Sequence, residues 1–288
     1  MEPLIGTVTA WDGLPIRVRI WDNGNHLPPI LCLPGLVRTG EDFDTVVPLF
    51  AAGRRVVALD YAGRGGSGRS ADVMRYGPEA CIRDVLDACA ALNLCHVVIV
   101  GTSFGGLLAM GLAAMRPALL RGVVLNDVGP EIGKSGAEFV RKFVALDPAL
   151  ESLDACVTFL KRHLPPLSLV SDDDWRAMAK LTYEPGADGR FHPVWDTAIA
   201  RLLNGKTPDL WPLFGALAHV PVLLARGEVS TLLSLETVAE MRARRPDMTV
   251  VTVPGVGHAP ILTEDAVRDV LRDFVSDTDS VHNSPRTN

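Results

Sequence analysis

Short runs of apolar residues alternate along the chain with longer stretches in which apolar residues recur every three or four positions. The runs are rich in β-branched residues and show no polar alternation, as expected of parallel strands buried on both faces. They lie at residues 28–34, 54–60, 96–101, 121–127, 220–226 and 248–254. The longer stretches have the spacing of amphipathic helices and lie at residues 78–93, 104–117, 234–246 and 263–275. This alternation predicts an α/β fold with a mostly parallel sheet and helices on both faces.

Two further strands are expected before these runs, at residues 5–10 and 15–21. They lie too close together for a crossover helix, so we expect an antiparallel hairpin at one edge, which brings the sheet to eight strands. The last residues, 277–288, contain almost nothing to bury and are predicted to form a disordered tail.

The alternation is interrupted at residues 131–213, where only helical patterns and Gly/Pro-rich joints such as EPGADG occur. We interpret this segment as a helical cap inserted into an α/β core made of residues 1–130 and 214–276. The cap and the residue after it hold nine of the chain's 17 aromatic residues. Most of these are expected to pack the cap onto the core, and a few should line an apolar pocket. The candidates for the pocket are Trp175, Trp195 and Phe139.

The composition, with 48% of the 288 residues hydrophobic and 22% charged, is that of a soluble protein with one substantial core. A formal net charge of −6 without a basic cluster argues against nucleic acid as a partner. There is no apolar run of about 18 residues and no secretory signal pattern, so we expect no membrane contact and a cytoplasmic location. The five cysteines lack metal-ligand spacing and are interpreted as core thiols. We expect a small-molecule substrate and neither cofactor nor metal, and a homodimer is left open.

The motif GTSFGG at residues 101–106 lies between an apolar run and a helical stretch. A bare GxSxG pattern is weak, but at a sharp strand-to-helix turn it raises the serine above the sheet as a nucleophile. Gly101 and Gly105 leave room for the backbone to pass close to its neighbours. The helix that follows directs its amino-terminal N–H groups toward charge that develops beside Ser103. The alternative is that Ser103 only caps this helix.

A serine hydroxyl is a poor nucleophile at neutral pH unless a base takes its proton. Among the seven histidines, His258 lies in the loop PGVGHAP directly after the last apolar run. We expect this loop to open at the sheet edge where Ser103 emerges. The other histidines lie in the tail, in turns, before strands or in the cap, where solvated or packed roles are expected.

Four motifs stand in the order LCLPGL (31–36), ALDYAGRGGSGRS (58–70), GTSFGG (101–106) and GVGHAP (255–260). With them the chain resembles the α/β-hydrolase superfamily over residues 1–276, in the branch of enol-lactonases, esterases and C–C hydrolases. The resemblance implies an oxyanion hole formed by the backbone N–H groups of Leu36 and Phe104. A Pro-Gly pair replaces the common His-Gly pair, but main-chain donors tolerate that change. Serine in place of a nucleophilic aspartate argues against dehalogenase or epoxide-hydrolase chemistry.

The acid of the triad is not where the resemblance places it. The usual position, within RGEVSTLLS (226–234), holds Thr231, which cannot stabilise an imidazolium by charge. Some family members carry the acid after the sixth strand, where this chain has Asp127. Glu228 is the alternative, although the glycine before it would turn it away from the histidine. A third option is that no acid serves, which by the serine-protease precedent costs on the order of 10⁴ in turnover.

The expected activity is hydrolysis of an ester or lactone of a small to medium apolar or aromatic substrate through an acyl-enzyme at Ser103. His258 would take the serine proton during attack and return it to the leaving group. Hydrolysis of a carbon–carbon bond would use much the same groups. The sequence is also compatible with a cofactor-free dioxygenase of heteroaromatic rings, and with a ligand-binding or receptor-like module that has residual catalysis.

Overall fold

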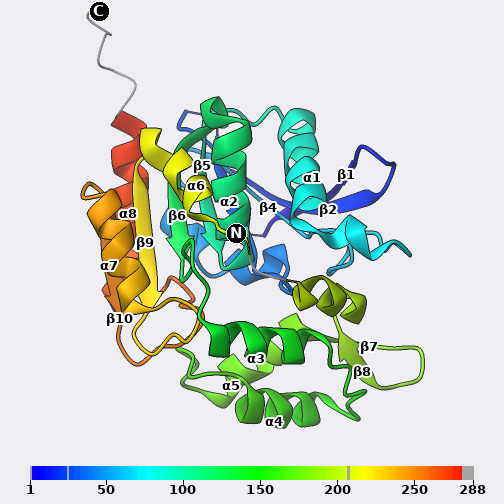
Figure 1. Ribbon diagram of the computed structural model, residues 1–288. Helices are drawn as coiled ribbons and strands as arrows, with labels where there is room; N and C mark the ends of the chain where they lie inside the picture. The colour runs from blue at the N-terminus through cyan, green and yellow to red at the C-terminus, as the bar shows by residue number, and fades with distance from the viewer. Residues whose placement is uncertain (1, 25, 206–207, 281–288) are drawn as a thin grey trace, which may run out of the picture.

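The structure, a computed structural model, describes residues 2–24, 26–205 and 208–280. Eight strands form one sheet in the order β1-β2-β4-β3-β5-β6-β9-β10 (Figure 1). β1 pairs with β2 and β2 with β4 in antiparallel fashion, and the other neighbours are parallel. The predicted mostly parallel eight-stranded sheet with a hairpin at one edge is confirmed. The strands are β1 (Leu4–Thr9), β2 (Pro15–Asp22), β3 (Ile30–Leu33), β4 (Arg55–Leu59), β5 (Val97–Thr102), β6 (Leu120–Asn126), β9 (Val222–Gly227) and β10 (Thr249–Val253).

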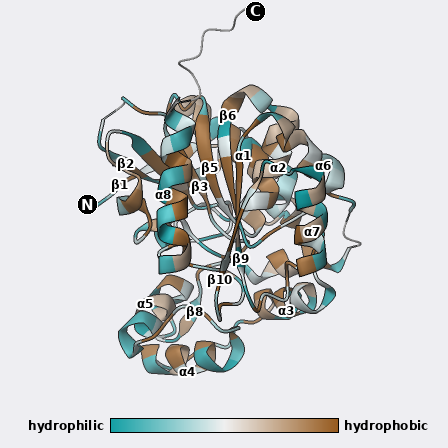
Figure 2. Ribbon diagram, turned by 90° about the vertical axis from the view of Figure 1, so that its left-hand side faces the viewer, coloured by the Kyte–Doolittle hydropathy of each residue, from teal (hydrophilic) through white to brown (hydrophobic). Residues whose placement is uncertain are grey.

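Helices cover both faces of the sheet, because each face of the apolar strands must be removed from water. One face packs against α1, α2, α6 and α7, and the other against α8 and the short turns η1 and η2. Figure 2 shows the hydrophobic strands in the middle, with α8 on one side and α2 and α7 on the other. No helix in the described part of the chain is long and apolar enough to cross a membrane. The core helices are α1 (Pro78–Ala91), α2 (Phe104–Met115), α6 (Trp211–Gly215), α7 (Leu235–Arg244) and α8 (Asp265–Ser280), with 3-10 turns η1 (Gly40–Phe43), η2 (Val47–Leu49), η3 (Val73–Tyr76), η4 (Pro117–Leu119) and η6 (Ala216–His219).

Between β6 and β9 the chain leaves the sheet and forms an insertion at one end of it (Figure 1). A purely helical insertion was expected, but the insertion also includes the antiparallel hairpin β7–β8. Each of these strands has three residues, too few to show an alternating pattern. The last four residues of EPGADG lie in the turn between the strands, with Gly189 at φ 77°. Its elements are α3 (Lys134–Val144), α4 (Leu153–His163), α5 (Asp172–Thr182), β7 (Tyr183–Pro185), β8 (Phe191–Pro193) and η5 (Thr197–Asn204).

Helix α8 continues to Ser280, so the prediction of a disordered tail at residues 277–288 is wrong for its first four residues. Arg121 donates hydrogen bonds to two carbonyls of the last helical turn, and Arg54 pairs with Asp279 at 2.7 Å. These arginines lie far away in sequence, so the local composition did not indicate the order they impose. The remainder of the predicted tail lies outside the described residues.

Candidate active site

Ser103 lies at the sharp turn between β5 and α2. Its backbone has φ 52° and ψ −113°, a region that residues other than glycine rarely adopt. A Cβ on Gly105 would lie 2.0 Å from the carbonyl oxygen of Leu33, and one on Gly101 would lie 2.7 Å from the backbone of Gly105. Both positions therefore require glycine. The Ser103 side chain makes no capping hydrogen bond to α2, which argues against the alternative of a simple helix cap.

The carboxylate of Asp127 lies beside His258. His258 Nδ1 is 2.8 Å from Asp127 Oδ2, and the aspartate side chain is fully buried. The Gly227 N–H donates to the other carboxylate oxygen at 3.0 Å, and the Ser230 hydroxyl donates to Oδ2 at 2.6 Å. With the histidine, the carboxylate has three hydrogen-bond partners, which fix its orientation. When Nδ1 is the donor, His258 presents Nε2 as an acceptor.

Of the two acids considered from the sequence, Glu228 is the one that turns away. Its side chain is exposed, and its Oε2 accepts a hydrogen bond from the Gly255 N–H at 2.8 Å. Thr231 is also exposed. The structure therefore brings Asp127, and not Glu228, to the histidine. Sequence reasoning missed Ser230, whose only signal was a hydroxyl next to the expected acid position.

Ser103 and His258 line one cavity of about 320 Å³, whose wall is formed by the core and by the insertion. Most of the wall is aliphatic or aromatic. Two of the predicted pocket residues, Phe139 and Trp195, belong to it. Trp195 also donates a hydrogen bond from Nε1 to the Val144 carbonyl at 2.9 Å, which satisfies its buried polar atom.

The third predicted pocket residue, Trp175, lies elsewhere, so that prediction is wrong. Helix α5 turns Asp174, Met178 and Leu181 toward the cavity, at the three- and four-residue spacing of one helix face. Trp175 is on a different face, where it packs in the apolar cluster that α4 and α5 share, with Lys161 5.9 Å from its ring. Asp174 thus faces the cavity, whereas Trp175, the next residue, does not.

Arg38 is a cation in the cavity wall that sequence reasoning also missed. Its guanidinium donates to both carboxylate oxygens of Asp42 and, at 2.7 Å, to the Thr182 hydroxyl. The ion pair compensates the charge of Arg38 within the wall. The third hydrogen bond joins the loop after β3 to the end of α5, and so joins the core to the insertion.

Leu36 and Phe104, the two expected oxyanion donors, come from neighbouring segments. Leu36 lines the cavity in the loop after β3, and Phe104 begins α2, where the first N–H groups have no acceptor within the helix. The Gly35 carbonyl accepts a hydrogen bond from the Arg38 N–H at 3.1 Å. Because the C=O and N–H of one trans peptide point in opposite directions, the Leu36 N–H points away from that turn.

The loop between α4 and α5 contacts the loop that carries His258. The Pro166 carbonyl accepts a hydrogen bond from the Gly257 N–H at 2.7 Å, and the Ser168 hydroxyl donates to Glu264. Neighbouring residues of the same loop line the cavity. The insertion is therefore attached directly to the histidine loop.

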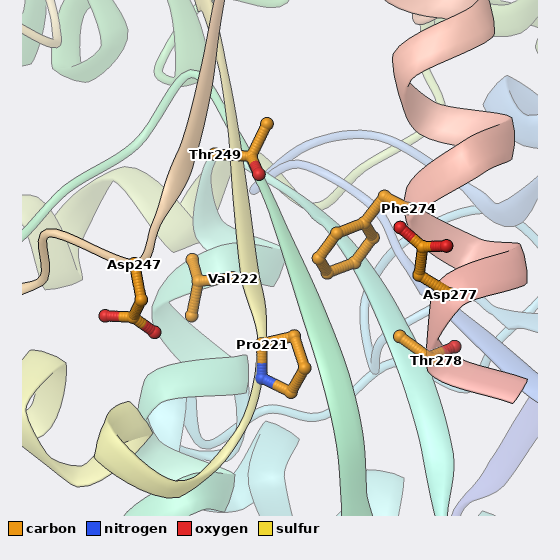
Figure 3. Close-up of a pocket in the computed structure, with 7 residues that line it drawn as sticks. All are labelled: Pro221, Val222, Asp247, Thr249, Phe274, Asp277 and Thr278. Carbon is orange, nitrogen blue, oxygen red and sulfur yellow. The ribbon is translucent and has the colours of Figure 1, made fainter. Parts of the chain in front are cut away.

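A smaller hollow of about 170 Å³ lies at the other end of the strands, where β9 and β10 begin (Figure 3). Ser103, Asp127 and His258 all follow the carboxyl ends of strands, so this hollow is separate from their cavity. One of its carboxylates, Asp247, pairs with Arg245 at 2.6 Å. It is lined by Pro221, Val222, Asp247, Thr249, Phe274, Asp277 and Thr278.

Known proteins share both the sequence pattern and the fold. The chain matches the alpha/beta hydrolase family over residues 30–271. A 3-hydroxybutyrate-oligomer hydrolase of Cupriavidus necator is 35% identical over 257 residues, which cover 85% of this chain and 87% of that protein. A 2-hydroxymuconate semialdehyde hydrolase of a Pseudomonas species is 32% identical over 77% of each chain.

Among solved structures, an alpha/beta hydrolase from Novosphingobium aromaticivorans superposes with a TM-score of 0.89 and is 36% identical, over 96% of this chain and 98% of that one. The family match covers the strands that carry Ser103, Asp127 and His258. The resemblance to the α/β-hydrolase superfamily, drawn from the four motifs, is confirmed. The chain belongs to the alpha/beta hydrolase family and is a hydrolase of that fold.

Proposed function

We propose that this hydrolase cleaves an ester or lactone of a small to medium apolar or aromatic substrate through an acyl-enzyme on Ser103. The observation that carries the proposal is the 2.8 Å contact between His258 Nδ1 and Asp127, because His258 lines the same cavity as Ser103. Together these residues supply a nucleophile, a base and a group that orients the base.

In the acylation step, His258 Nε2 accepts the proton of Ser103 while the serine Oγ attacks the substrate carbonyl carbon. Negative charge moves to the carbonyl oxygen, where the Leu36 and Phe104 N–H groups would stabilise it. Asp127 keeps the imidazole in the tautomer that carries the proton on Nδ1, and it stabilises the imidazolium. When the intermediate collapses, the bond to the leaving oxygen breaks and the histidine proton passes to the alcohol.

Water completes the cycle in the deacylation step. His258 accepts a proton from the water as its oxygen attacks the acyl carbon, and the same oxyanion donors serve again. Collapse releases the carboxylic acid and returns the proton to Ser103 Oγ. Because one imidazole acts in both steps, its orientation must be kept throughout the cycle. The hydrogen bonds that fix the Asp127 carboxylate support that orientation.

The cavity wall supports the choice of substrate. A volume of about 320 Å³ is at the small end of ligand pockets. Its aliphatic and aromatic side chains favour an apolar acyl or alcohol group, which gains by leaving water. The relative that acts on 3-hydroxybutyrate oligomers supports an ester, since hydroxy-acid units in such oligomers are joined by ester bonds.

The test is turnover of 4-nitrophenyl esters from acetyl to decanoyl, followed by intact-mass measurement after treatment with a fluorophosphonate. We expect wild-type protein to release nitrophenol, to prefer one range of chain length and to gain the mass of one phosphonyl group. Ser103→Ala should lose both the turnover and the mass increase, while Ser276→Ala, an exposed serine on α8, should keep both. Turnover that persists in Ser103→Ala would contradict the proposal.

Carbon–carbon hydrolysis is the second candidate, supported by the relative that is named for 2-hydroxymuconate semialdehyde. Comparing kcat/KM for a 2-hydroxy-6-oxo-dienoate with kcat/KM for the best ester separates the two reactions. A higher value for the dienoate would replace the ester assignment.

A further inference from the structure

Arg64 is a fully buried cation beside the candidate site that the chemistry above does not use. It lies in the tight turn after β4, and its relative exposure is 0%. Its Nε donates to the Leu36 carbonyl at 2.8 Å, and its Nη1 donates to the Ala62 carbonyl at 2.7 Å. Among the described residues, no carboxylate forms an ion pair with it.

Burying such a charge is unfavourable. An isolated cation in a low-dielectric site loses its hydration, and without an anionic partner only hydrogen bonds and polarisable groups offset that loss. Three aromatic rings surround the guanidinium, with centroids 5.6 to 5.9 Å from its carbon: those of Tyr61, Tyr76 and Phe104. Burial lowers the pKa of Arg64, but a guanidinium stays charged at neutral pH. A neutral side chain would pack here at lower cost, so the charge needs an explanation.

The contacts of the loop after β3 supply one. Three successive carbonyls of this loop are held by hydrogen bonds: Pro34 by the Tyr61 hydroxyl at 3.1 Å, Gly35 by the Arg38 N–H at 3.1 Å, and Leu36 by Arg64. The peptides on both sides of Leu36 therefore have fixed planes. The Leu36 N–H shares its peptide with the Gly35 carbonyl, so its direction is set by the contact with the Arg38 N–H, while Arg64 fixes the peptide that follows Leu36.

Arg64 is also close to the second donor. The ring of Phe104 lies 5.9 Å from the guanidinium and packs edge-on against Tyr61 at 5.5 Å. One buried positive charge thus borders both residues whose N–H groups would receive the oxyanion. In a water-excluded site, a fixed charge of this kind favours negative charge that develops nearby.

We propose that Arg64 is a positioning residue of the oxyanion hole: it fixes the peptide that follows Leu36, which limits rotation of the adjacent peptide that carries the Leu36 N–H, and it adds a positive charge without an ion-pair partner beside Leu36 and Phe104. The inference rests on the proposed function of Ser103. It predicts that loss of the guanidinium weakens binding of the transition state more than binding of the substrate.

The test compares Arg64→Met and Arg64→Lys with a matched control, Arg245→Met. Arg245 is 7% exposed and also donates to two backbone carbonyls, those of Leu217 and Val220, but it follows α7 and pairs with Asp247, which lines the smaller hollow. Thermal unfolding reports stability, and 4-nitrophenyl butyrate gives kcat and KM. The inhibition constant of an alkyl trifluoromethyl ketone, which forms a tetrahedral oxyanion adduct with a serine, reports affinity for the transition state.

We expect Arg64→Met to lower kcat by about 10²-fold, which is near the smallest loss found when one oxyanion donor is removed. The inhibition constant of the ketone should rise by a similar factor. KM should change less than about threefold, because the substrate carbonyl carries little charge before attack. Arg64→Lys keeps the charge but not the planar fork, so its losses should be intermediate. Arg245→Met should lose stability while its kcat stays close to that of the wild type.

A kcat and a ketone affinity within twofold of Arg245→Met in both Arg64 variants would overturn the inference, as would a loss of kcat without a loss of ketone affinity. If Arg64→Met does not fold, Arg64→Lys is judged by the same criteria. The Ser103→Ala variant distinguishes failure of the Arg64 inference from failure of the proposed function. Wild-type turnover that does not depend on Ser103 overturns both, whereas turnover that depends on Ser103 but is unaffected by Arg64 overturns only the role of Arg64.

Discussion

Ser230 donates a hydrogen bond of 2.6 Å to the same Asp127 oxygen that contacts His258. The loop after β9 would supply the acid in the pattern that the sequence resembles, and here it supplies a hydroxyl that supports an acid from β6. The Ser230 oxygen is itself fixed, because it accepts hydrogen bonds from the N–H groups of Leu232 and Leu233 at 3.2 and 3.3 Å. The carboxylate has moved to another strand, while the loop still contributes to its orientation.

Asp127→Asn should lower kcat for an ester by about 10⁴-fold, since an amide leaves His258 without the charge and the tautomer that it needs. Glu228→Gln is the matched control and should stay within about twofold of the wild type, because its side chain is exposed and bonds the Gly255 N–H. Steady-state kinetics on one 4-nitrophenyl ester measures both. Equal losses in the two variants would contradict the assignment of the acid.

Ser230→Ala should destabilise the protein by roughly 1–3 kcal/mol, because it removes a donor from a buried carboxylate. It should also lower kcat, since one of the three partners that fix Asp127 is lost. Thr231→Ala, at the exposed neighbouring position, should change neither quantity. Urea unfolding and ester kinetics on both variants test this, and a Ser230→Ala protein that matches Thr231→Ala would show that the hydroxyl has no role.

Gly105→Ala should destabilise the fold by about 1–3 kcal/mol or more, because its Cβ would lie 2.0 Å from the Leu33 carbonyl oxygen. It should also push α2 away from the loop after β3 and so separate the two oxyanion donors. Gly215→Ala has open space around the new methyl group and a helical φ of −59°, and it should be neutral or slightly stabilising. Thermal unfolding compares the two, and equal melting temperatures would refute the close contact.

Phe139→Ala should shift the preference among 4-nitrophenyl esters toward longer acyl chains, because Phe139 lines the cavity and its removal enlarges it. Trp175→Ala deletes a larger ring but lies on another face of α5, so its chain-length preference should match that of the wild type. The ratio of kcat/KM for decanoyl and butyryl esters measures the shift. A larger shift in Trp175→Ala would mean that the cavity is assigned to the wrong side chains.

The hairpin β7–β8 should lose stability as pH rises. His192 donates hydrogen bonds to the carboxylates of Asp147 and Asp188, and these contacts raise its pKa, so its protonated form is favoured in the folded state. This contribution is complete below the ordinary histidine pKa of about 6.5 and is lost as pH rises through the higher folded value. The melting temperature of wild type relative to His192→Gln should be higher at pH 5.5 than at pH 9. A difference that does not depend on pH would contradict this role.

Local patterns were sufficient for the parts of the fold that depend on local chemistry. The six continuous apolar runs became strands, five of them buried almost throughout and β10 partly exposed at the edge of the sheet, and GTSFGG located the turn at Ser103 because only glycine allows its backbone contacts. The hairpin β7–β8 was not predicted, because strands of three residues are too short to show the two-residue periodicity of a β-strand.

The missed features depend on residues that are distant in sequence. Ser230 acquires its role from Asp127, and Arg64 acquires its role from Leu36. The order at the end of α8 comes from Arg54 and Arg121, neither of which lies near that helix in the chain. Whether Trp175 lines the cavity depends on which face of α5 turns toward the cavity. The helical periodicity of the sequence does not show which face that is.

The contact between Pro166 and Gly257 limits how this enzyme can be redesigned. A chimaera that exchanges the insertion for that of another hydrolase would lose the carbonyl that receives the Gly257 N–H, and with it a support for the neighbouring His258. Such a chimaera would lose catalytic rate even where its new pocket binds substrate well, unless the donor loop supplies an equivalent carbonyl. Exchanging single wall residues on α3 and α5, with the segment from Pro165 to Ser168 kept, avoids that loss.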